Sequence, residues 1–453
     1  MSVEQERRFV LDIDASQLLQ EALAEQLSYE ETNEQDSDES IPLKTYPVVS
    51  RIPGPKLTPL KDLAKPHLPQ LPTKTSTSSY TPDYTLSPKQ RKNVKSKMRA
   101  RSLRYDQRQK KQLEAKSSLK ALVLGHASRI TKVRVTFKHA FEHPKGVWTG
   151  KRTATDTKML TLEQVLAIPG MQLVKWNGRT STIYEDCQGV PLLLMGAAPN
   201  SIEWDALVRR VDTVFMQLGK RLNWQKILRR RGWHLSVPIG ESFGGGQTRP
   251  ANFSHTPHDE EAINDVTCDP DVRRVAGLCD HYLKVYFPKI HTLYANALER
   301  IHEDNPSLRR NFDNSVFAAA NINIEKAVAF PHVDYLNLLF GLCAVFPTGS
   351  FDYTRGGHLI IWELGLVIEF PPGTVILLPS ALFKHSNTAI ADSETRSSIT
   401  FYSASGLFRW VHNGCMSDKE FKLRANQKTR RRWEEHRRDL WKIGVELLKP
   451  VDE

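Results

Sequence analysis

The stretch "AFPHVDYLNLLFG", residues 329–341, places a histidine and an aspartate two positions apart inside an otherwise apolar run. Side chains of a β-strand repeat every second residue, so His332 and Asp334 would point to the same face of a strand. Two interpretations fit this pair: part of a metal site, or the polar edge of a strand. Residues elsewhere in the chain have to decide between them.

The sequence around this stretch, residues 314–412, has the pattern of dense β-structure, with short runs of β-branched and aromatic residues separated by turn signals. Eight candidate strands are predicted at 316–323, 326–334, 337–345, 357–362, 366–370, 374–379, 385–389 and 396–402. Breaks are predicted at 347–349, 355–357, 365 and 371–373, where Gly and Pro gather. Eight short antiparallel strands within about a hundred residues predict a jelly roll (a double-stranded β-helix), in which two sheets face each other.

Helices are expected on both sides of this β-rich region. Residues 171–196 alternate as strands do, whereas 201–222 have helical periodicity with Ser201 as the N-cap. Helices are also predicted within 270–311, interrupted near Pro288, and in the basic tail from residue 418. The predicted fold class is therefore α+β overall, with a mostly β core and flanking α-helices.

Length and composition indicate a globular core with extensions. The chain has 453 residues, 40% of them hydrophobic, which is enough for a sizeable core. It contains no run of about eighteen apolar residues and begins without a signal-peptide pattern, so we expect no membrane span and an intracellular protein. Five widely spaced cysteines without a C-x-x-C motif indicate a reducing compartment, and neither a disulfide framework nor a zinc finger.

The net charge of +12 is concentrated in one segment. Residues 89–120 contain thirteen basic and two acidic residues, a net charge of +11, whereas residues 1–50 contain twelve acidic and three basic residues. A block of this kind is typical of a nucleic-acid contact or a nuclear import signal, so DNA and an import receptor are its two expected partners. The alternative is a solvated basic helix. The candidate contacts are Lys95, Lys97, Arg99 and Arg101.

These patterns divide the chain into five expected regions. They are a disordered region, acidic and then Pro/Ser/Thr-rich (1–86), a basic segment (87–119), an α/β support region (120–313), the jelly-roll core (314–412) and a basic helical tail (413–453).

A second histidine supports the metal interpretation of the opening pair. Two histidines and one carboxylate form a facial triad that leaves three metal positions open, which suits Fe(II) enzymes that activate O2. In a jelly roll this site takes His-x-Asp from an early strand and a histidine from the seventh. His385, 53 residues after His332, begins the seventh candidate strand. We interpret His281, His358 and His412 as surface or core histidines.

An arginine eleven residues after His385 adds the second half of a site. Arg396 opens the eighth candidate strand, and Ser398 shares its strand face. A 2-oxoglutarate co-substrate chelates iron at one end and needs a cation for its distant carboxylate, for which arginine offers a planar two-pronged donor. A lone His-x-Asp is expected about once by chance in this chain. Order, spacing and strand placement together carry the prediction.

The chain resembles the Fe(II)- and 2-oxoglutarate-dependent dioxygenases of the TET/JBP-like branch, and a related family expanded in mushroom-forming fungi. The resembling stretches begin with "SLRRNFDNSVFAAANINI" (307–324), run through "FPHVDYLNLLFG" and "KHSNT", and end with "ETRSSITFYSASGLFRWVHNG" (394–414). The loop "GESFGGGQTRPANF" (240–253) extends the resemblance to about residue 160. The cysteine-rich zinc-binding region of TET enzymes has no counterpart here. The resemblance implies the iron ligands His332, Asp334 and His385, the 2-oxoglutarate anchor Arg396, and further contacts from Asn321 and Asn323.

Together, the resemblance and the basic segment imply that the protein oxidises a methylated base in DNA, with 5-methylcytosine as the first candidate. O2 would be the co-substrate, and succinate and CO2 would be released. The nucleus is then the expected location. A base must leave the duplex to reach iron, and "SFGGGQTRP" could line the entrance, with Arg249 at a phosphate; an ordinary flexible turn is the alternative. Two other functions stay open: a protein or small-molecule hydroxylase, and an inactive jelly roll that binds nucleic acid.

Overall fold

The computed structural model describes residues 148–150, 157–223, 231–244 and 246–449, the backbone strand Arg129–Lys132, and the single residues Lys89 and Ser96. All of these except Lys89 and Ser96 belong to one compact unit. The predicted disordered region 1–86 and the four basic candidates Lys95, Lys97, Arg99 and Arg101 lie outside the described residues.

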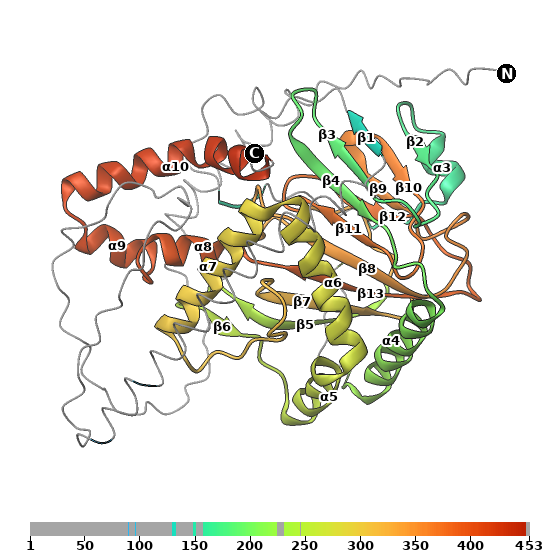
Figure 1. Ribbon diagram of the computed structural model, residues 1–453, viewed down its shortest axis with the longest axis horizontal. Coiled ribbons are helices and arrows are strands. Elements are labelled where there is room, and N and C mark those ends of the chain that lie inside the picture. Colours follow the sequence, from blue (N-terminus) through green and yellow to red (C-terminus); the bar gives the residue numbers. More distant parts are fainter. Residues whose placement is uncertain are drawn as a thin grey trace. The chain divides into compact units, whose positions relative to one another are not determined.

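Two β-sheets form the core of the described residues (Figure 1). The larger sheet has nine strands in the order β1-β3-β4-β11-β8-β13-β7-β5-β6, and the smaller has the order β12-β9-β10-β2. Neighbouring strands are antiparallel except in the β1–β3 and β10–β2 pairs. The strands are β1 (Arg129–Lys132), β2 (Gln172–Val174), β3 (Thr182–Glu185), β4 (Pro191–Gly196), β5 (Leu235–Ser242), β6 (Ala251–Asn252), β7 (Ala319–Ile324), β8 (Cys343–Ser350), β9 (Leu359–Ile361), β10 (Leu366–Ile368), β11 (Val375–Leu378), β12 (His385–Asn387) and β13 (Thr395–Tyr402).

Helices flank the large sheet, with α4, α6 and α7 in front of it in Figure 1 and α8 to α10 beside it. The helices are α3 (Leu162–Leu166), α4 (Ile202–Arg221), α5 (Pro257–Cys268), α6 (Pro270–Tyr286), α7 (Pro288–Asp304), α8 (Ser405–His412), α9 (Asp418–Arg424) and α10 (Gln427–Leu448), with a 3-10 turn η2 at Trp362–Leu364. Their buried faces follow the helical repeat, so burial of apolar side chains holds them on the sheet. None of the helices in the described part is long and apolar enough for a bilayer span.

From β8 onward the chain alternates between the two sheets. Strand β8 lies in the large sheet, β9 and β10 in the small one, β11 in the large one, β12 in the small one and β13 in the large one. Strands β3, β4 and β5, which precede residue 314, join the same large sheet. The sheet therefore takes its strands from both sides of the predicted boundary between support region and core.

The α+β prediction, with a mostly β core and flanking helices, is confirmed. The helix over 201–222 and the interruption near Pro288 are confirmed too: Ser201 caps α4 by accepting from the N–H of Trp204, and Pro288 begins α7 directly after α6. Because proline lacks an N–H, it suits the first turn of a helix and no later position.

The strand predicted at 326–334 and the break predicted at 347–349 are wrong, and the strand predicted at 337–345 begins only at Cys343, as β8. Residues 326–334, which carry the histidine and aspartate of the opening pair, form no strand but a loop held by isolated bridges. Its backbone bonds go first to β13 and then to β12, because the chain crosses there from the large sheet to the small one. The predicted break at 347–349 lies inside β8, where Pro347 sits opposite Ser398 and Gly349 takes a φ of 113°.

Helix α10 docks on the core through a glycine that leaves room for a phenylalanine. A Cβ on Gly444 would lie 2.3 Å from a ring carbon of buried Phe340, well inside contact distance. We predict that Gly444→Ala lowers the free energy of unfolding by about 1–3 kcal/mol through overpacking, although alanine favours a helix over glycine by about 1 kcal/mol. Urea unfolding measures the change, with exposed Glu434→Ala on the same helix as control. A variant as stable as the wild type would contradict the packing.

Candidate metal centre and its cavity

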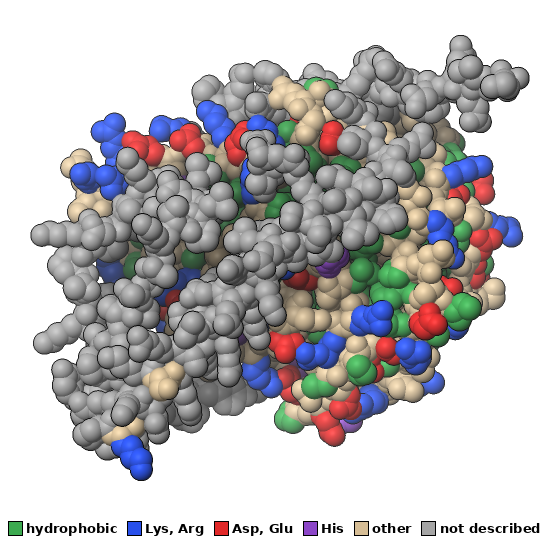
Figure 2. Space-filling view, viewed as in Figure 1, with side chains coloured by type: hydrophobic (Ala, Val, Ile, Leu, Met, Phe, Trp, Pro, Cys, Tyr) green, Lys and Arg blue, Asp and Glu red, His purple; other side chains and the backbone are tan. Residues whose placement is uncertain are grey.

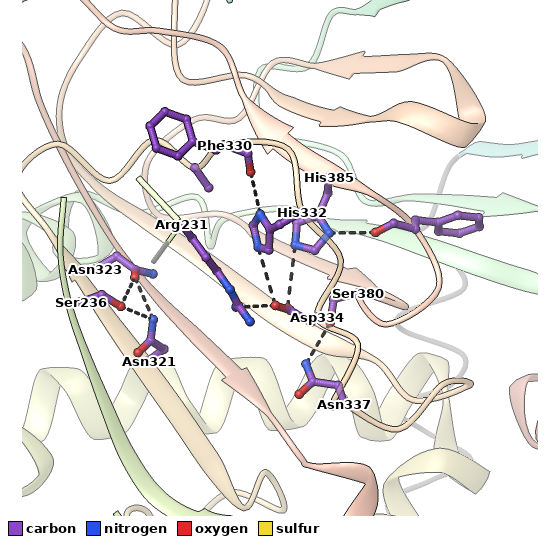
Figure 3. Close-up of polar contacts among 12 residues, drawn as sticks. Arg231, Ser236, Asn321, Asn323, Phe330, His332, Asp334, Asn337, Ser380 and His385 are labelled. Carbon is purple, nitrogen blue, oxygen red and sulfur yellow. Dashed lines mark hydrogen bonds and ion pairs between the residues drawn. The ribbon is translucent and has the colours of Figure 1, made fainter. Parts of the chain in front are cut away.

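Three side chains that could hold a metal ion lie together between the two sheets. One ligand atom from each of His332, Asp334 and His385 lies within 4.8 Å of the others. Nε2 of His332 is 3.6 Å from Oδ1 of Asp334, and Nε2 of His385 is 3.8 Å from Oδ2 (Figure 3). Within the described part of the chain, no other group of three or more His, Cys, Asp or Glu side chains meets the same condition. The predicted triad is thus brought together in space.

Backbone bonds between the two histidines fix this arrangement. The N–H of His332 donates to the carbonyl of His385 at 3.0 Å, and the N–H of His385 donates back to the carbonyl of His332 at 2.9 Å. The N–H of Asp334 donates to the carbonyl of Ser380 at 2.9 Å, in the turn that leads to β12. The loop 326–334 therefore needs no strand of its own to place His332 and Asp334 beside His385.

The hydrogen bonds of the two imidazoles orient their free nitrogens inward. Nδ1 of His332 lies 2.7 Å from the carbonyl oxygen of Phe330, and Nδ1 of His385 lies 2.9 Å from that of Phe383. A carbonyl oxygen only accepts, so each Nδ1 carries the proton and each Nε2 keeps a lone pair. Both lone pairs belong to the nitrogens nearest Asp334, which is the tautomer that a metal ligand needs.

Burial keeps the two imidazoles neutral. It lowers the pKa of His332 well below 6.5, and the neighbouring His385 and Arg231 act in the same direction. Burial likewise lowers the pKa of His385, although Asp334 opposes the shift. Neutral imidazole is the form that binds a metal.

Asp334 is ionised although it is buried. Burial alone would raise the pKa of its carboxyl, but the charge of Arg231 is the largest of the effects that outweigh burial, and the pKa falls to about 2. Arg231 forms an ion pair with Oδ1 of Asp334 (Figure 3). The site thus offers two neutral nitrogen donors and one anionic oxygen donor, which is the donor set of the facial triad.

Arg396 is a buried cation near this centre. Its side chain is 2% exposed, and no carboxylate among the described residues forms an ion pair with it. One guanidinium nitrogen, Nη1, donates to the carbonyl of Ala327, while the buried Nε has no hydrogen-bond partner. The guanidinium carbon lies 5.6 Å from the ring centre of Phe351 and 5.8 Å from that of Phe370. Burial lowers the pKa of Arg396 to about 10, so it stays charged at pH 7.

Aromatic contact offsets only part of the free energy that burying such a charge costs. An anion that enters beside the guanidinium would offset the rest. The residues present thus fit both groups that the sequence predicts: a metal ion on the triad and a carboxylate on Arg396.

One cavity of about 830 Å³ contains both features. Its lining includes the three triad residues and Arg396. Strand β13 contributes every second residue to the lining, namely Arg396, Ser398, Thr400 and Tyr402. The residues between them are buried on the opposite side, where Ile399 and Phe401 join the hydrophobic core. The strand repeat therefore gives the large sheet one polar face toward the cavity and one apolar face toward the helices.

Next to Arg396, this polar face carries a hydrogen-bonded row across three strands. Nδ2 of Asn323 donates to Oγ of Ser398 at 3.2 Å, while Oδ1 of Asn323 accepts from Ser236 at 3.0 Å and from Asn321 at 2.9 Å. Nδ2 of Asn321 also donates to Ser236 at 2.6 Å (Figure 3). The predicted co-substrate residues Ser398, Asn321 and Asn323 all line the cavity, and Asn323 is the link between the other two.

The glycine-rich loop forms part of the cavity wall, through Ser242, Phe243, Gly244 and Gln247. Arg249 follows this lining as an exposed residue and is not itself part of it.

Three histidines outside the triad are interpreted from the sequence as surface or satisfied core residues; of these, His358 is a core residue whose buried Nε2 has no hydrogen-bond partner among the described residues. Burial lowers the pKa of His358 to about 4, and its Nδ1 pairs with the hydroxyl of Thr388 at 2.9 Å. His412 stacks on His436 with 4.0 Å between ring centres. His281 is partly buried on α6. None of the three joins a possible metal group among the described residues.

Sequence reasoning missed the segment "RGWH", residues 231–234. Arg231 and His234 line the cavity, and the carbonyl of Arg231 accepts from the N–H of Phe330 at 2.7 Å. A Cβ on Gly232 would lie 2.5 Å from the carbonyl oxygen of Val328, so only glycine allows this close approach. No periodic pattern links this segment to Asp334, about a hundred residues later. The strand repeat of β13, in contrast, could have added Thr400 and Tyr402.

Comparison with known proteins gives structural likeness only. The sequence matches no protein-family model and no curated protein sequence. One similar solved structure is described as NgTET1 in complex with 5mC DNA, with 15% identity, 52% of this chain and 84% of that chain covered, and a TM-score of 0.37.

Two further structures are similar to smaller parts of the chain. One is an oxidoreductase of the 2OG-Fe(II) oxygenase family from Burkholderia pseudomallei, with 17% identity and a TM-score of 0.24. The alignment covers 46% of this chain and 92% of that chain. The other is OsALKBH1, with 11% identity, 44% and 89% coverage, and a TM-score of 0.25. At these identities and TM-scores the alignments establish neither the activity nor the substrate of this chain.

The triad geometry predicts that one substitution removes metal binding. We expect His332→Ala to lower the affinity for a divalent ion such as Co²⁺ by more than about 100-fold, above the 10–100-fold typical of residues that only support ligands. Titration followed by the visible spectrum of bound Co²⁺ measures this. His281→Ala, outside the cluster, is the control and should bind as the wild type does. Equal affinity in the two variants would rule out His332 as a ligand.

Proposed function

We propose that the chain is an Fe(II)- and 2-oxoglutarate-dependent dioxygenase that oxidises a methylated base in DNA, with 5-methylcytosine as the first candidate. The observation that carries the proposal is the presence, in one cavity, of the triad and a buried arginine without an ion-pair partner among the described residues. Either feature alone is common. Their combination serves a reaction that needs both a metal with open positions and an anionic co-substrate.

In this proposal His332, Asp334 and His385 hold the iron. Three protein ligands leave room on the metal for the co-substrate and O2. The carbonyls of Phe330 and Phe383 fix the imidazole tautomers, and Arg231 holds Asp334 ionised. When bound, iron and 2-oxoglutarate supply an oxidation in which O2 adds one oxygen to a substrate C–H bond and the other to succinate, with release of CO2.

Arg396 binds the distant carboxylate of 2-oxoglutarate in this arrangement. Charge-assisted hydrogen bonds to a carboxylate are stronger than those to a carbonyl, so the guanidinium gains a better partner than Ala327. Ser398 lies on the same strand face and already accepts from Asn323, which leaves its hydroxyl proton to donate. Asn321 and Asn323 keep this row of polar groups in place. The two facing sheets, as a jelly roll, enclose the centre and limit access of water.

The substrate half of the proposal rests on the sequence and on the size of the cavity. Its volume of about 830 Å³ lies in the range of pockets that hold a small-molecule ligand. The +11 segment suits a phosphate backbone. DNA is the proposed partner and the nucleus the proposed location, with an import receptor as the alternative reader of that segment.

Turnover with oligonucleotides tests the proposal. Purified full-length protein with Fe(II), 2-oxoglutarate and O2 should release succinate in proportion to added 5-methylcytosine DNA, with a matching loss of 5-methylcytosine by mass spectrometry. Unmethylated DNA of the same sequence is the control and should give only background release. Succinate release indifferent to DNA would instead indicate a protein or small-molecule hydroxylase. If the protein releases no succinate and binds no iron under any condition, the proposed dioxygenase activity is refuted.

Arg396 gives a second prediction that does not depend on the substrate. We expect Arg396→Met to weaken binding of 2-oxoglutarate by about 10–100-fold, the worth of charge-assisted hydrogen bonds of roughly 1.5–3 kcal/mol. Because 2-oxoglutarate binds only the folded chain, thermal unfolding should show its stabilisation in the wild type and lose it in the variant. Exposed Arg355→Met is the control. Equal stabilisation in all three proteins would remove Arg396 from the co-substrate site.

A further inference from the structure

The described part of the chain carries a basic cluster outside the cavity, at the turn between α9 and α10. Residues 419–432 contain seven basic side chains and one acidic one, a net charge of +6. All seven are exposed: Lys419, Lys422, Arg424, Lys428, Arg430, Arg431 and Arg432. We name them the hairpin cluster. Lys and Arg side chains gather at this end of α10 in Figure 2, on the left of the view.

A rigid base supports this cluster. Phe421 on α9 stacks on Trp433 of α10 with 5.5 Å between ring centres, and the indole N–H of Trp433 donates to Asn413 at 2.8 Å. Both aromatic side chains are buried. Asn426 caps α10 by accepting from the N–H of Thr429. The two helices are therefore held in a fixed relation, which gives the cluster a defined shape.

The cluster lies where a helix tolerates positive charge least. Four of the first six residues of α10 are cationic, and its first turn contains no acidic residue. The positive end of the helix dipole lies at that end, so cations there are unfavourable for the helix itself. The helices α4, α5, α6 and α9 carry acids in their first turns instead. A local preference broken in this way points to a function rather than to stability.

The base of the cluster lies next to the wall of the cavity. Phe243 of the glycine-rich loop lines the cavity and packs edge-on against Trp410 of α8, with 5.1 Å between ring centres. Helix α8 leads directly to Asn413, which accepts from the indole N–H of Trp433 at the base of the cluster. Arg249 follows the same glycine-rich loop, and its charge lowers the pKa of Glu420 on α9 after the larger effect of the Ser417 N–H. A polyanion that lies on the hairpin cluster is therefore placed beside the glycine-rich loop.

The surface fits nucleic acid better than a membrane. A basic amphipathic helix that binds a bilayer inserts an exposed apolar face, but the apolar residues of α10 are buried in this fold, among them Trp433, Leu440, Trp441 and Val445. Leu423 is the one large apolar side chain exposed at the turn within the described residues. Duplex DNA carries one negative charge per roughly 1.7 Å of its axis, which matches a dense group of cations.

We propose that the hairpin cluster, with Arg249, binds the phosphate backbone of duplex DNA beside the cavity. The inference deepens the proposed function and rests on it, since it takes the DNA substrate as the occupant. It gives the C-terminal helices α9 and α10 a role in binding the DNA substrate. Arg424, Lys428 and Arg431 surround the turn between the helices and are the residues chosen for the test.

Salt-dependent binding tests this surface. The variant Arg424→Gln, Lys428→Gln, Arg431→Gln and the full-length wild type are titrated against a fluorescently labelled 20-base-pair duplex between 50 and 200 mM salt. Each lost phosphate contact lowers the slope of log K against log salt by about 0.9, so the slope should fall by about 2–3. Affinity at 100 mM salt should fall by about tenfold or more. The control Lys175→Gln, Arg209→Gln, Lys220→Gln removes the same charge elsewhere and should keep the wild-type slope.

The outcomes separate this inference from the proposed function. A slope equal to that of the control would overturn it, as would tighter binding to anionic lipid vesicles than to the duplex. The background release of succinate without DNA, measured in parallel, should be the same in all three proteins. If the wild type releases succinate in proportion to 5-methylcytosine DNA but the slope of the variant is unchanged, the proposed surface is wrong and the proposed enzyme stands. If the slope falls but no protein binds iron or releases succinate, the surface stands and the enzyme is wrong.

Discussion

The reciprocal backbone bonds between His332 and His385 are the constraint on which the site depends. Two hydrogen bonds of 3.0 and 2.9 Å connect a loop that leaves the large sheet to a strand of the small one. These bonds fix the backbone of each histidine. The carbonyl two residues earlier in the chain then orients its ring. Ring position, tautomer and direction of the lone pair thus follow from backbone geometry, and few side chains are needed to support them.

Buried charge is the second organising feature. Asp334 and Arg396 are both charged and buried in one cavity. Asp334 has an ion-pair partner in Arg231, whereas Arg396 contacts a carbonyl and two aromatic rings, with no carboxylate partner in the described part of the chain. A buried charge without an opposite charge lowers stability. The fold accepts this cost at the place where an anionic co-substrate would remove it.

The sequence predicted the parts of the structure that local patterns control. Helix α4, the break at Pro288 and most strands follow from periodicity and from proline chemistry, which act within a few residues. The pair His332 and Asp334 is visible as a local His-x-Asp motif, whereas His385, 53 residues later, could be added only through the strand order expected of a jelly roll. The loop 326–334 was mistaken for a strand because its apolar residues are buried as in a strand, while its hydrogen bonds go to two different partners. Arg231 gave no signal, since its ion pair with Asp334 depends on how distant segments fold together.

The loop 326–334, with Glu325 just before it, also connects Arg396 to His332 and Asp334, so the two parts of the site should open and close together. The N–H of Arg396 donates to the carbonyl of Glu325, the N–H of Ala327 donates to the carbonyl of Arg396, and the same loop ends in two triad residues. Glu325 takes a positive φ of 73° at the start of this loop, a conformation that such residues seldom adopt. Any local opening that frees the loop from β13 and β12 displaces the candidate triad residues and Arg396 at once. In a hydrogen-exchange experiment, the backbone amides of the loop and of Arg396 should therefore exchange together, as one cooperative unit.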